Sequence, residues 1–488
     1  MPVIPGASVS NSPVLQRLRR CALAAAAAVL ASCASVPAPS VAAPETFPPE
    51  AVRADLRFVM ETLECNHPDL ASSVDRRELE RTLAEVERTL DHPLTRDEAW
   101  AALARLNPAF ADGHVLIGPP GWREESRAQL ARGGGFFPFE VFLGPDGAPR
   151  ILSALGGGST AHAGRALTRI NGQDAREVVR ELMSRMHGDT PRFRAALLAL
   201  RWWLYYGKLH GTPARFELEL DGAEVVRVPA SRELPAMLRA EEDFERLYRF
   251  ELLDGGNALL TLGSFSYPDK ARYFAFVQDA FSRMRTAGTR RLIIDLRANG
   301  GGDDDMWKEG ILRYVADRPY RAGSSYLKRV QESSRKPGET TGQVVAGEIT
   351  SLEEPRLEEP LRFEGEVWLL VGPLTYSSAV LFSNVVQDYH FGAVAGVGDV
   401  VRVRQSGGVQ SVALPHTGLM LSYPRFVLDR PSGAREPALL RPEVVLDDDP
   451  LQPRAAVDAL LSRPVLTPRA LPPPASAARP APPPVHPR

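Results

Sequence analysis

The residues best suited to chemistry lie in two short segments, each of which follows an apolar run. The first, Asp295 to Gly302, ends in three consecutive glycines. Glycines let backbone amides approach a ligand closely, and amides between a strand and a helix can bind an anion. No Lys-Ser or Lys-Thr pair follows the glycines, so the segment is not a phosphate-binding P-loop. The second segment, Leu374 to Ala379, places Ser377 at a strand-to-helix junction, a favourable position for an exposed nucleophile.

Together, the two segments resemble the C-terminal processing (tail-specific) family of serine peptidases. The family pattern is Asp-Leu-Arg-x-Asn-x-Gly-Gly, and the eight residues that begin at Asp295 match it throughout. A small-residue motif that contains the nucleophile follows further along the chain. The resemblance implies that Ser377 is this nucleophile. It also implies an oxyanion hole made by the backbone amide of Gly301 or Gly300 and by that of Ser378.

The family divides according to its general base, and this chain departs from the lysine-dependent branch. That branch has a lysine soon after the serine. Here the corresponding segment contains Arg402 and Arg404, and no lysine follows Lys336. An arginine cannot lose its proton at a usable pH, so the sequence excludes a Ser–Lys pair at that position.

The other branch, which resembles the tricorn protease core, uses a histidine. Residues 112–116, which include His114, resemble its base motif, and Glu436 keeps that branch's spacing to a following proline and acid. The resemblance implies that His114 is the general base for Ser377 and that Glu436 orients or polarises the site, as in a catalytic triad. Gly113 stands where tricorn has a serine. This leaves open the fourth side chain, and whether Glu436 contacts His114 directly or through water.

Composition excludes several classes of protein. The 58 Lys and Arg against 60 Asp and Glu give a net charge of −2, without the basic excess of a nucleic-acid binder. The three cysteines cannot form a disulfide scaffold, and no Cys/His cluster suggests zinc. The acids at 303–305 open a predicted helix and are expected to form its solvated first turn. We therefore expect no metal and no cofactor. Among the other histidines, His390 is the nearest alternative base, although a predicted helix end also favours a capping histidine.

The N-terminus has the pattern of an export signal. Arginines at 17, 19 and 20 precede an apolar run, Cys21 to Leu30, that is too short to span a bilayer. The following Leu-Ala-Ser-Cys, which ends at Cys33, resembles a bacterial lipobox. The resemblance implies cleavage before Cys33 and diacylation of its thiol. Because Ala34 rather than Asp follows, we expect an outer-membrane lipoprotein on the periplasmic side of the cell envelope. A plain signal peptide with an incidental Cys33 is the alternative.

The rest of the chain divides by its periodicity into parts that predict a multidomain α/β protein. Apolar residues at helical spacing predict a helical domain at 50–133. Short β-like runs around an Asn171-Gly172 turn resemble a PDZ-like, β-rich insert at 134–235. Alternating strands and helices predict an α/β core at 236–463, of the ClpP/crotonase-like type that the family resemblance implies. Residues 1–32 are the predicted signal peptide, 33–49 a flexible tether and 464–488 a disordered Pro/Ala-rich tail.

These features predict a serine peptidase that hydrolyses peptide bonds of extended polypeptides or peptides in the cell envelope. The expected mechanism uses Ser377, His114 and Glu436 and passes through an acyl-enzyme. The expected partners are a peptide or protein substrate and, through Cys33, a membrane; nucleic acid is not expected, and the oligomeric state is not predicted. The alternative is a non-catalytic peptide- or ligand-binding lipoprotein on the same fold.

Overall fold

The computed structural model describes residues 45–332 and 335–464, and the described residues from Thr46 onward belong to one compact unit. The predicted signal peptide, the lipidation site Cys33, most of the tether and nearly all of the C-terminal tail lie outside the described residues. No helix of the described chain is both long and apolar enough to cross a membrane.

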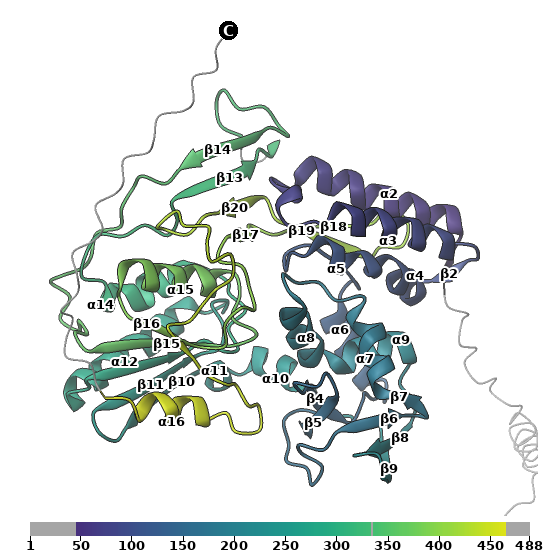
Figure 1. Ribbon diagram of the computed structural model, residues 1–488, viewed down its shortest axis with the longest axis horizontal. Coiled ribbons are helices and arrows are strands. Elements are labelled where there is room, and N and C mark those ends of the chain that lie inside the picture. The colour runs from purple at the N-terminus through teal and green to yellow at the C-terminus, as the bar shows by residue number, and fades with distance from the viewer. Residues whose placement is uncertain (1–44, 333–334, 465–488) are drawn as a thin grey trace, which may run out of the picture. The chain divides into compact units, whose positions relative to one another are not determined.

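The N-terminal part is helical, as its periodicity predicts (Figure 1). In α2 the apolar positions of one face, among them Val52 and Val59, are fully buried. Thr95 caps α4 in a capping box with Glu98, because each contacts the other's backbone amide. The elements are β1 (Thr46–Phe47), α2 (Pro49–Asn66), α3 (Arg76–Thr89), β2 (Leu94–Thr95), α4 (Arg96–Leu103), α5 (Asn107–Phe110), β3 (Leu116–Gly118) and α6 (Trp122–Ala131).

The insert contains the expected strands and a pair of helices that the sequence pattern does not indicate. Asn171 and Gly172, both with positive φ, form the tight turn between β6 and β7. The missed helices are α8 (Pro191–Leu200) and α9 (Trp202–His210), and α9 buries five consecutive residues, 202–206. The other elements are β4 (Phe139–Leu143), β5 (Pro149–Ala154), β6 (Leu167–Ile170), β7 (Gln173–Asp174), α7 (Ala175–Met183), β8 (Arg215–Leu220) and β9 (Glu224–Pro229), with sheet order β7-β6-β8-β9.

The core is a six-stranded sheet of order β10-β11-β12-β15-β16-β21, parallel except for the edge strand β10. Its four inner strands are largely buried on both faces, as crossover helices require. Leu292 and Ile294 join the main hydrophobic cluster, whereas Ile293 faces α16. The strands are β10 (Tyr248–Leu253), β11 (Asn257–Leu262), β12 (Arg291–Asp295), β15 (Glu366–Val371), β16 (Ala393–Gly396) and β21 (Val444–Val445).

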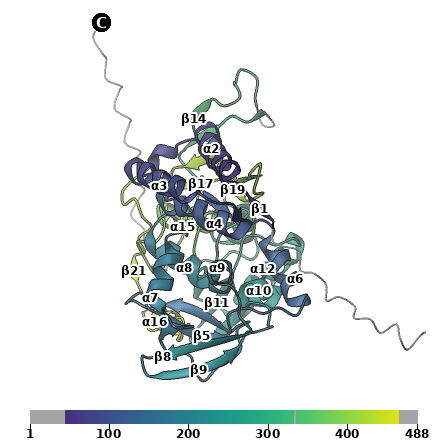
Figure 2. The same cartoon turned by 90° about the vertical axis from the view of Figure 1, so that its right-hand side faces the viewer.

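The helices of this part include α12 and α15, which the sequence predicts, and a helix interrupted by a π-helical turn. They are α10 (Ala236–Glu242), α11 (Phe244–Leu247), α12 (Lys270–Ala287), α13 (Asp305–Trp307), the π turn (Lys308–Leu312), α14 (Arg313–Val315), α15 (Ser378–Tyr389) and α16 (Ala455–Leu461). Two smaller antiparallel sheets join them: β14-β13-β20-β17 and β18-β19-β3. Figure 1 labels most of their strands, and Figure 2 shows β14, β17 and β19 in a second view. Their strands are β13 (Ser325–Arg329), β14 (Val344–Glu348), β17 (Gln405–Gly407), β18 (Gln410–Ala413), β19 (Met420–Tyr423) and β20 (Phe426–Leu428).

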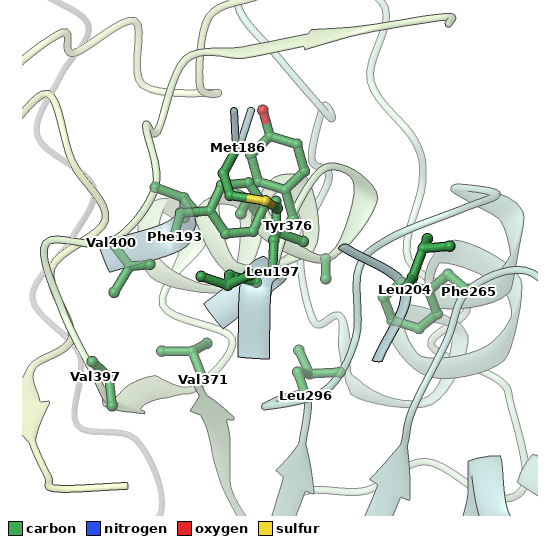
Figure 3. Close-up of a cluster of buried hydrophobic side chains, with 14 of the residues drawn as sticks. Met186, Phe193, Leu197, Leu204, Phe265, Leu296, Val371, Tyr376, Val397 and Val400 are labelled. Carbon is green, nitrogen blue, oxygen red and sulfur yellow. The ribbon is translucent and has the colours of Figure 1, made fainter. Parts of the chain in front are cut away.

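Helix α8 of the insert packs against the ends of the core strands. Figure 3 shows Phe193 and Leu197 of α8 in a buried cluster with Leu296, Val371 and Tyr376. The rings of Phe193 and Tyr376 lie 4.5 Å apart. The α/β class predicted from the sequence is therefore confirmed, and the insert shares a hydrophobic core with the strand ends.

Candidate active site

The loop after β15 holds Ser377 in a strained backbone conformation. Ser377 has φ 53° and ψ −123° and lies half-buried just before α15. A non-glycine residue in such a region costs about 1–3 kcal/mol, which surrounding contacts must offset. Gly301 lies close against this residue, since a Cβ atom added to it would lie 2.7 Å from the Cβ of Ser377. The loop thus presents the hydroxyl while a glycine gives it room.

Polar residues of the two predicted segments join the loop after β12 to the loop after β15. The Tyr376 amide donates to the Asn299 carbonyl at 3.0 Å, and the Thr375 hydroxyl donates to the Leu296 carbonyl at 2.7 Å. The buried Asn299 side chain also donates to the Leu262 carbonyl at 2.9 Å. The non-glycine residues of this motif therefore position the loops, because they satisfy buried backbone groups.

His114 lies between Ser377 and a second serine. Its Nε2 is 3.1 Å from Ser377 Oγ, and its Nδ1 is 2.8 Å from Ser406 Oγ. The Ser406 hydroxyl donates to Asp112 Oδ1 at 2.8 Å, so its oxygen is left to accept from His114 Nδ1–H. This chain of hydrogen bonds favours the tautomer with a free lone pair on Nε2, the form that a general base for Ser377 needs.

Burial and nearby charges set the protonation of this group. Burial lowers the pKa of His114 below its ordinary 6.5, and the charge of Asp112 offsets only part of that effect. Burial alone would raise the pKa of Asp112. The nearby His67, whose Nε2 lies 3.6 Å from Oδ2, and His114 outweigh burial and bring the pKa of Asp112 to about 2. At neutral pH the arrangement is therefore a neutral imidazole backed by a carboxylate.

Glu436, predicted to orient or polarise the site, does not contact His114. It is exposed on the segment after β20, and its Oε2 accepts from the nearby Ala438 amide at 3.2 Å. The place beside Nδ1 is occupied by Ser406, with Asp112 behind it. This corrects the predicted arrangement. The physical reason is that Glu436 lies exposed on a surface segment, while Asp112 is buried two residues before His114.

Packing explains why a glycine precedes the histidine. A Cβ atom added to Gly113 would lie 2.6 Å from the ring of Tyr376, so a serine does not fit there without displacing that ring. The hydroxyl that contacts Nδ1 comes from Ser406, which is 292 positions away in the sequence. No local signal marks Ser406, whereas Asp112 lies within the motif that identified His114.

The backbone amides of Gly300 and Ser378 have no acceptor within the described chain. The Ser378 amide begins α15, where the first N–H groups have no intrahelical partner. The Gly301 amide already donates to Asn299 Oδ1 at 2.9 Å. Of the two glycines that the sequence left open, Gly300 is therefore the one with an available N–H. The Ser377 amide donates to Gln405 Oε1 at 3.1 Å.

The alternative residues lie elsewhere or serve another role. His390 caps the far end of α15 and is exposed, about 18 Å of helix away from Ser377. Arg402 donates to the Ala111 carbonyl and supports the segment before His114. Among residues 45–332 and 335–464, no three His, Cys, Asp or Glu side chains are grouped so as to hold a metal ion.

Comparison with known proteins finds a family match and a shared fold. Residues 258–443 match the model of peptidase family S41, a span that includes Ser377 and Ser406 but begins after His114. The chain is similar to the crystal structure of mature CPAF, with 15% identity and a TM-score of 0.60, over 85% of this chain and 95% of that one. Mature CPAF complexed with lactacystin is similar at 13% identity and a TM-score of 0.59, over 84% and 97%. No curated protein matches the sequence significantly.

Proposed function

The chain contains a peptidase family S41 domain and is a serine peptidase, and from this premise we propose that Ser377 and His114 cleave extended peptides or polypeptides. The observation that carries the proposal is the 3.1 Å contact between His114 Nε2 and Ser377 Oγ. Ser406 and Asp112, rather than Glu436, hold the tautomer that leaves Nε2 free to accept a proton.

The proposed reaction passes through an acyl-enzyme. His114 Nε2 takes the Ser377 proton as Oγ attacks the carbonyl carbon of the scissile bond. The amides of Gly300 and Ser378 donate to the oxyanion, a contact that contributes about 3–4 kcal/mol for each donor in related chemistry. As the intermediate collapses, the C–N bond breaks and His114 protonates the leaving amine. A water molecule, deprotonated by His114, then attacks the ester and releases Ser377.

A serine-directed fluorophosphonate probe and a peptide digest test this assignment. We expect the mature protein to be labelled on Ser377 and to cleave peptides, and Ser377→Ala to lose both properties while keeping the fold. Ser411→Ala is the matched control, because Ser411 is exposed and its hydroxyl bonds only that of Ser422 in the described chain. Wild-type cleavage by Ser377→Ala would refute the assignment. Peptide binding without cleavage or labelling of the wild type would instead indicate the non-catalytic alternative.

The location in the cell envelope is a separate proposal, which rests on the N-terminal sequence. The arginines and apolar run before Cys33 support export, lipidation of its thiol and an outer-membrane position. Cells grown with an alkyne-tagged fatty acid should attach the tag to the wild type and not to Cys33→Ser. A wild-type protein that is exported without the tag would indicate a plain signal peptide.

A further inference from the structure

A buried carboxylate of the insert lies between the segments that carry the base and the nucleophile. Asp189 follows α7 and comes just before Thr190, the N-cap of α8, and its side chain is only 3% exposed. Asp189 Oδ1 accepts from the Gly113 amide at 3.0 Å and from the Tyr376 hydroxyl at 2.9 Å. Its Oδ2 accepts from the Arg402 amide at 2.9 Å.

One oxygen, Asp189 Oδ1, therefore bonds both the residue before His114 and the residue before Ser377. Gly113 precedes His114, and Tyr376 precedes Ser377. The Gly113 amide also lies 3.0 Å from the Tyr376 hydroxyl, so the three groups close a small ring of polar contacts. The Tyr376 ring lies 4.9 Å from the His114 ring.

We propose that Asp189 is a positioning residue, which fixes His114 and Ser377 at reacting distance by holding Gly113 and Tyr376. This inference rests on the proposed function of that pair. A shift of about 1 Å between reacting groups can lower a rate about 100-fold, so contacts at both neighbouring residues bear directly on catalysis. The carboxylate accepts three hydrogen bonds, two of them on Oδ1, whereas a neutral amide in its place would turn a donor toward one of the three N–H or O–H groups.

The surroundings make the ionised form of Asp189 costly to the fold. Burial first, and then the charge of Asp112, raise the pKa of Asp189 to about 6. Because this pKa lies above the ordinary 3.8, the folded state binds the Asp189 proton more tightly than the unfolded chain does. The stability that this proton gives to the fold is fully present below pH 3.8 and is lost as the pH rises through about 6. At neutral pH the carboxylate therefore opposes folding while it accepts all three hydrogen bonds. The charged and titratable groups that face it are Asp112, Tyr376, Arg194 and Arg402, and a cavity of about 60 Å³ beside it is also lined by His67 and Arg404.

The first test compares Asp189→Asn with Asp174→Asn in the full-length mature protein. Asp174 lies in the same insert, is exposed and caps α7, a role that asparagine also fills. We expect Asp189→Asn to lower kcat and the rate of fluorophosphonate labelling about 10- to 100-fold, with KM nearly unchanged. Asp174→Asn should keep wild-type values. Wild-type kinetics in a folded Asp189→Asn would overturn the inference.

The second test is the acid limb of kcat/KM, which a merely structural role would not change. The wild type must lose a proton from both His114 and Asp189, so its logarithmic slope should approach about two, and that of Asp189→Asn about one. Equal slopes would overturn the inference. If Asp189→Asn does not fold, Tyr376→Phe keeps the ring and removes one hydroxyl, and the inference requires it to slow labelling as well. A wild type that is not labelled would refute the proposed function itself, an outcome distinct from these.

Discussion

At the scale of single residues, the hydroxyl of Ser406 stands where a carboxylate would contact the histidine of an ordinary triad. It accepts from His114 Nδ1 and donates to Asp112, so it links the His114 ring to a buried carboxylate. Ser406→Ala should leave Nδ1–H without a partner and lower kcat about 10- to 100-fold, since the tautomer and ring orientation lose their support. Ser406→Thr should restore most of the rate, which steady-state peptide hydrolysis would measure.

Glu436→Gln tests whether His114 is supported by Ser406 and Asp112 or, as the sequence predicted, by Glu436. Because Glu436 is exposed and bonds only its own segment in the described chain, the amide should change kcat less than two-fold or so. A loss as large as that of Ser406→Ala would return Glu436 to the mechanism. The same kinetic assay gives the answer.

Gly113 provides a prediction about stability. Introducing the serine found in tricorn places a Cβ within 2.6 Å of the Tyr376 ring, so the ring or the backbone must move. We expect Gly113→Ser to lower the free energy of unfolding by about 1–3 kcal/mol, as overpacking does, and to slow catalysis. Urea denaturation measures the first effect. A fully stable and more active variant would show that the tricorn arrangement fits this chain.

The residues that could be predicted from sequence are those with a local pattern. Ser377 and His114 lie in short motifs, and the structure places His114 Nε2 3.1 Å from Ser377 Oγ. Ser406 and Asp189 have no such pattern, because their roles arise from contacts with residues far away along the chain. The spacing of Glu436 to the following proline and acid predicted the wrong partner for His114. A spacing along the chain does not determine whether a side chain points toward the site or toward solvent.

At the scale of elements, the core strands and helices could be predicted because their apolar runs alternate regularly with helical ones. Helices α8 and α9 were missed. They are apolar on several sides, with α8 packed on the core strands and α9 burying Trp202 and Trp203, and a helix buried in this way shows no clear amphipathic period. The packing of α8 against Tyr376, through Phe193, is therefore visible only in the structure.

Helix α16 depends on one buried arginine. Arg291, 1% exposed, pairs with Glu366 at 2.6 Å and donates to the carbonyls of Leu460 and Arg463 at the end of α16. Arg291→Met should lower the free energy of unfolding by about 3–5 kcal/mol, because it leaves the Glu366 charge unpaired and the helix end uncapped. Urea denaturation measures this loss.

Two further variants test that explanation. Arg290→Met removes the neighbouring exposed arginine and should change stability by no more than about 0.5 kcal/mol. The double variant Arg291→Met/Glu366→Met should recover part of the loss, since no unpaired charge remains. A double variant as unstable as Arg291→Met would show that the helix cap, rather than the buried charge, is the main contribution.

At the scale of the whole molecule, the three predicted parts share one hydrophobic cluster. It includes Val59 of the helical part, Phe193 of the insert and Val371 of the core. Polar contacts cross the same boundaries, since Asp189 and Thr190 of the insert bond to Arg402 and Val400 of the core. Removing any one part would expose the apolar surface of the others, so we expect the parts to unfold together.

Coincident unfolding is a demanding prediction, because chains with several domains commonly unfold in steps. Tryptophan fluorescence reports on the insert through Trp202 and Trp203 and on the core through Trp307 and Trp368, while far-ultraviolet circular dichroism reports on the backbone. The two signals should share one midpoint in urea. Phe193→Ala removes packing between α8 and Tyr376 and should lower the free energy of unfolding by about 3–5 kcal/mol. Both signals should then share one lower midpoint. Val225→Ala, exposed in the same insert, should leave it in place. Two separate transitions in the wild type would show that the insert folds on its own, and the contacts of Asp189 would then join two domains rather than parts of one cooperative unit.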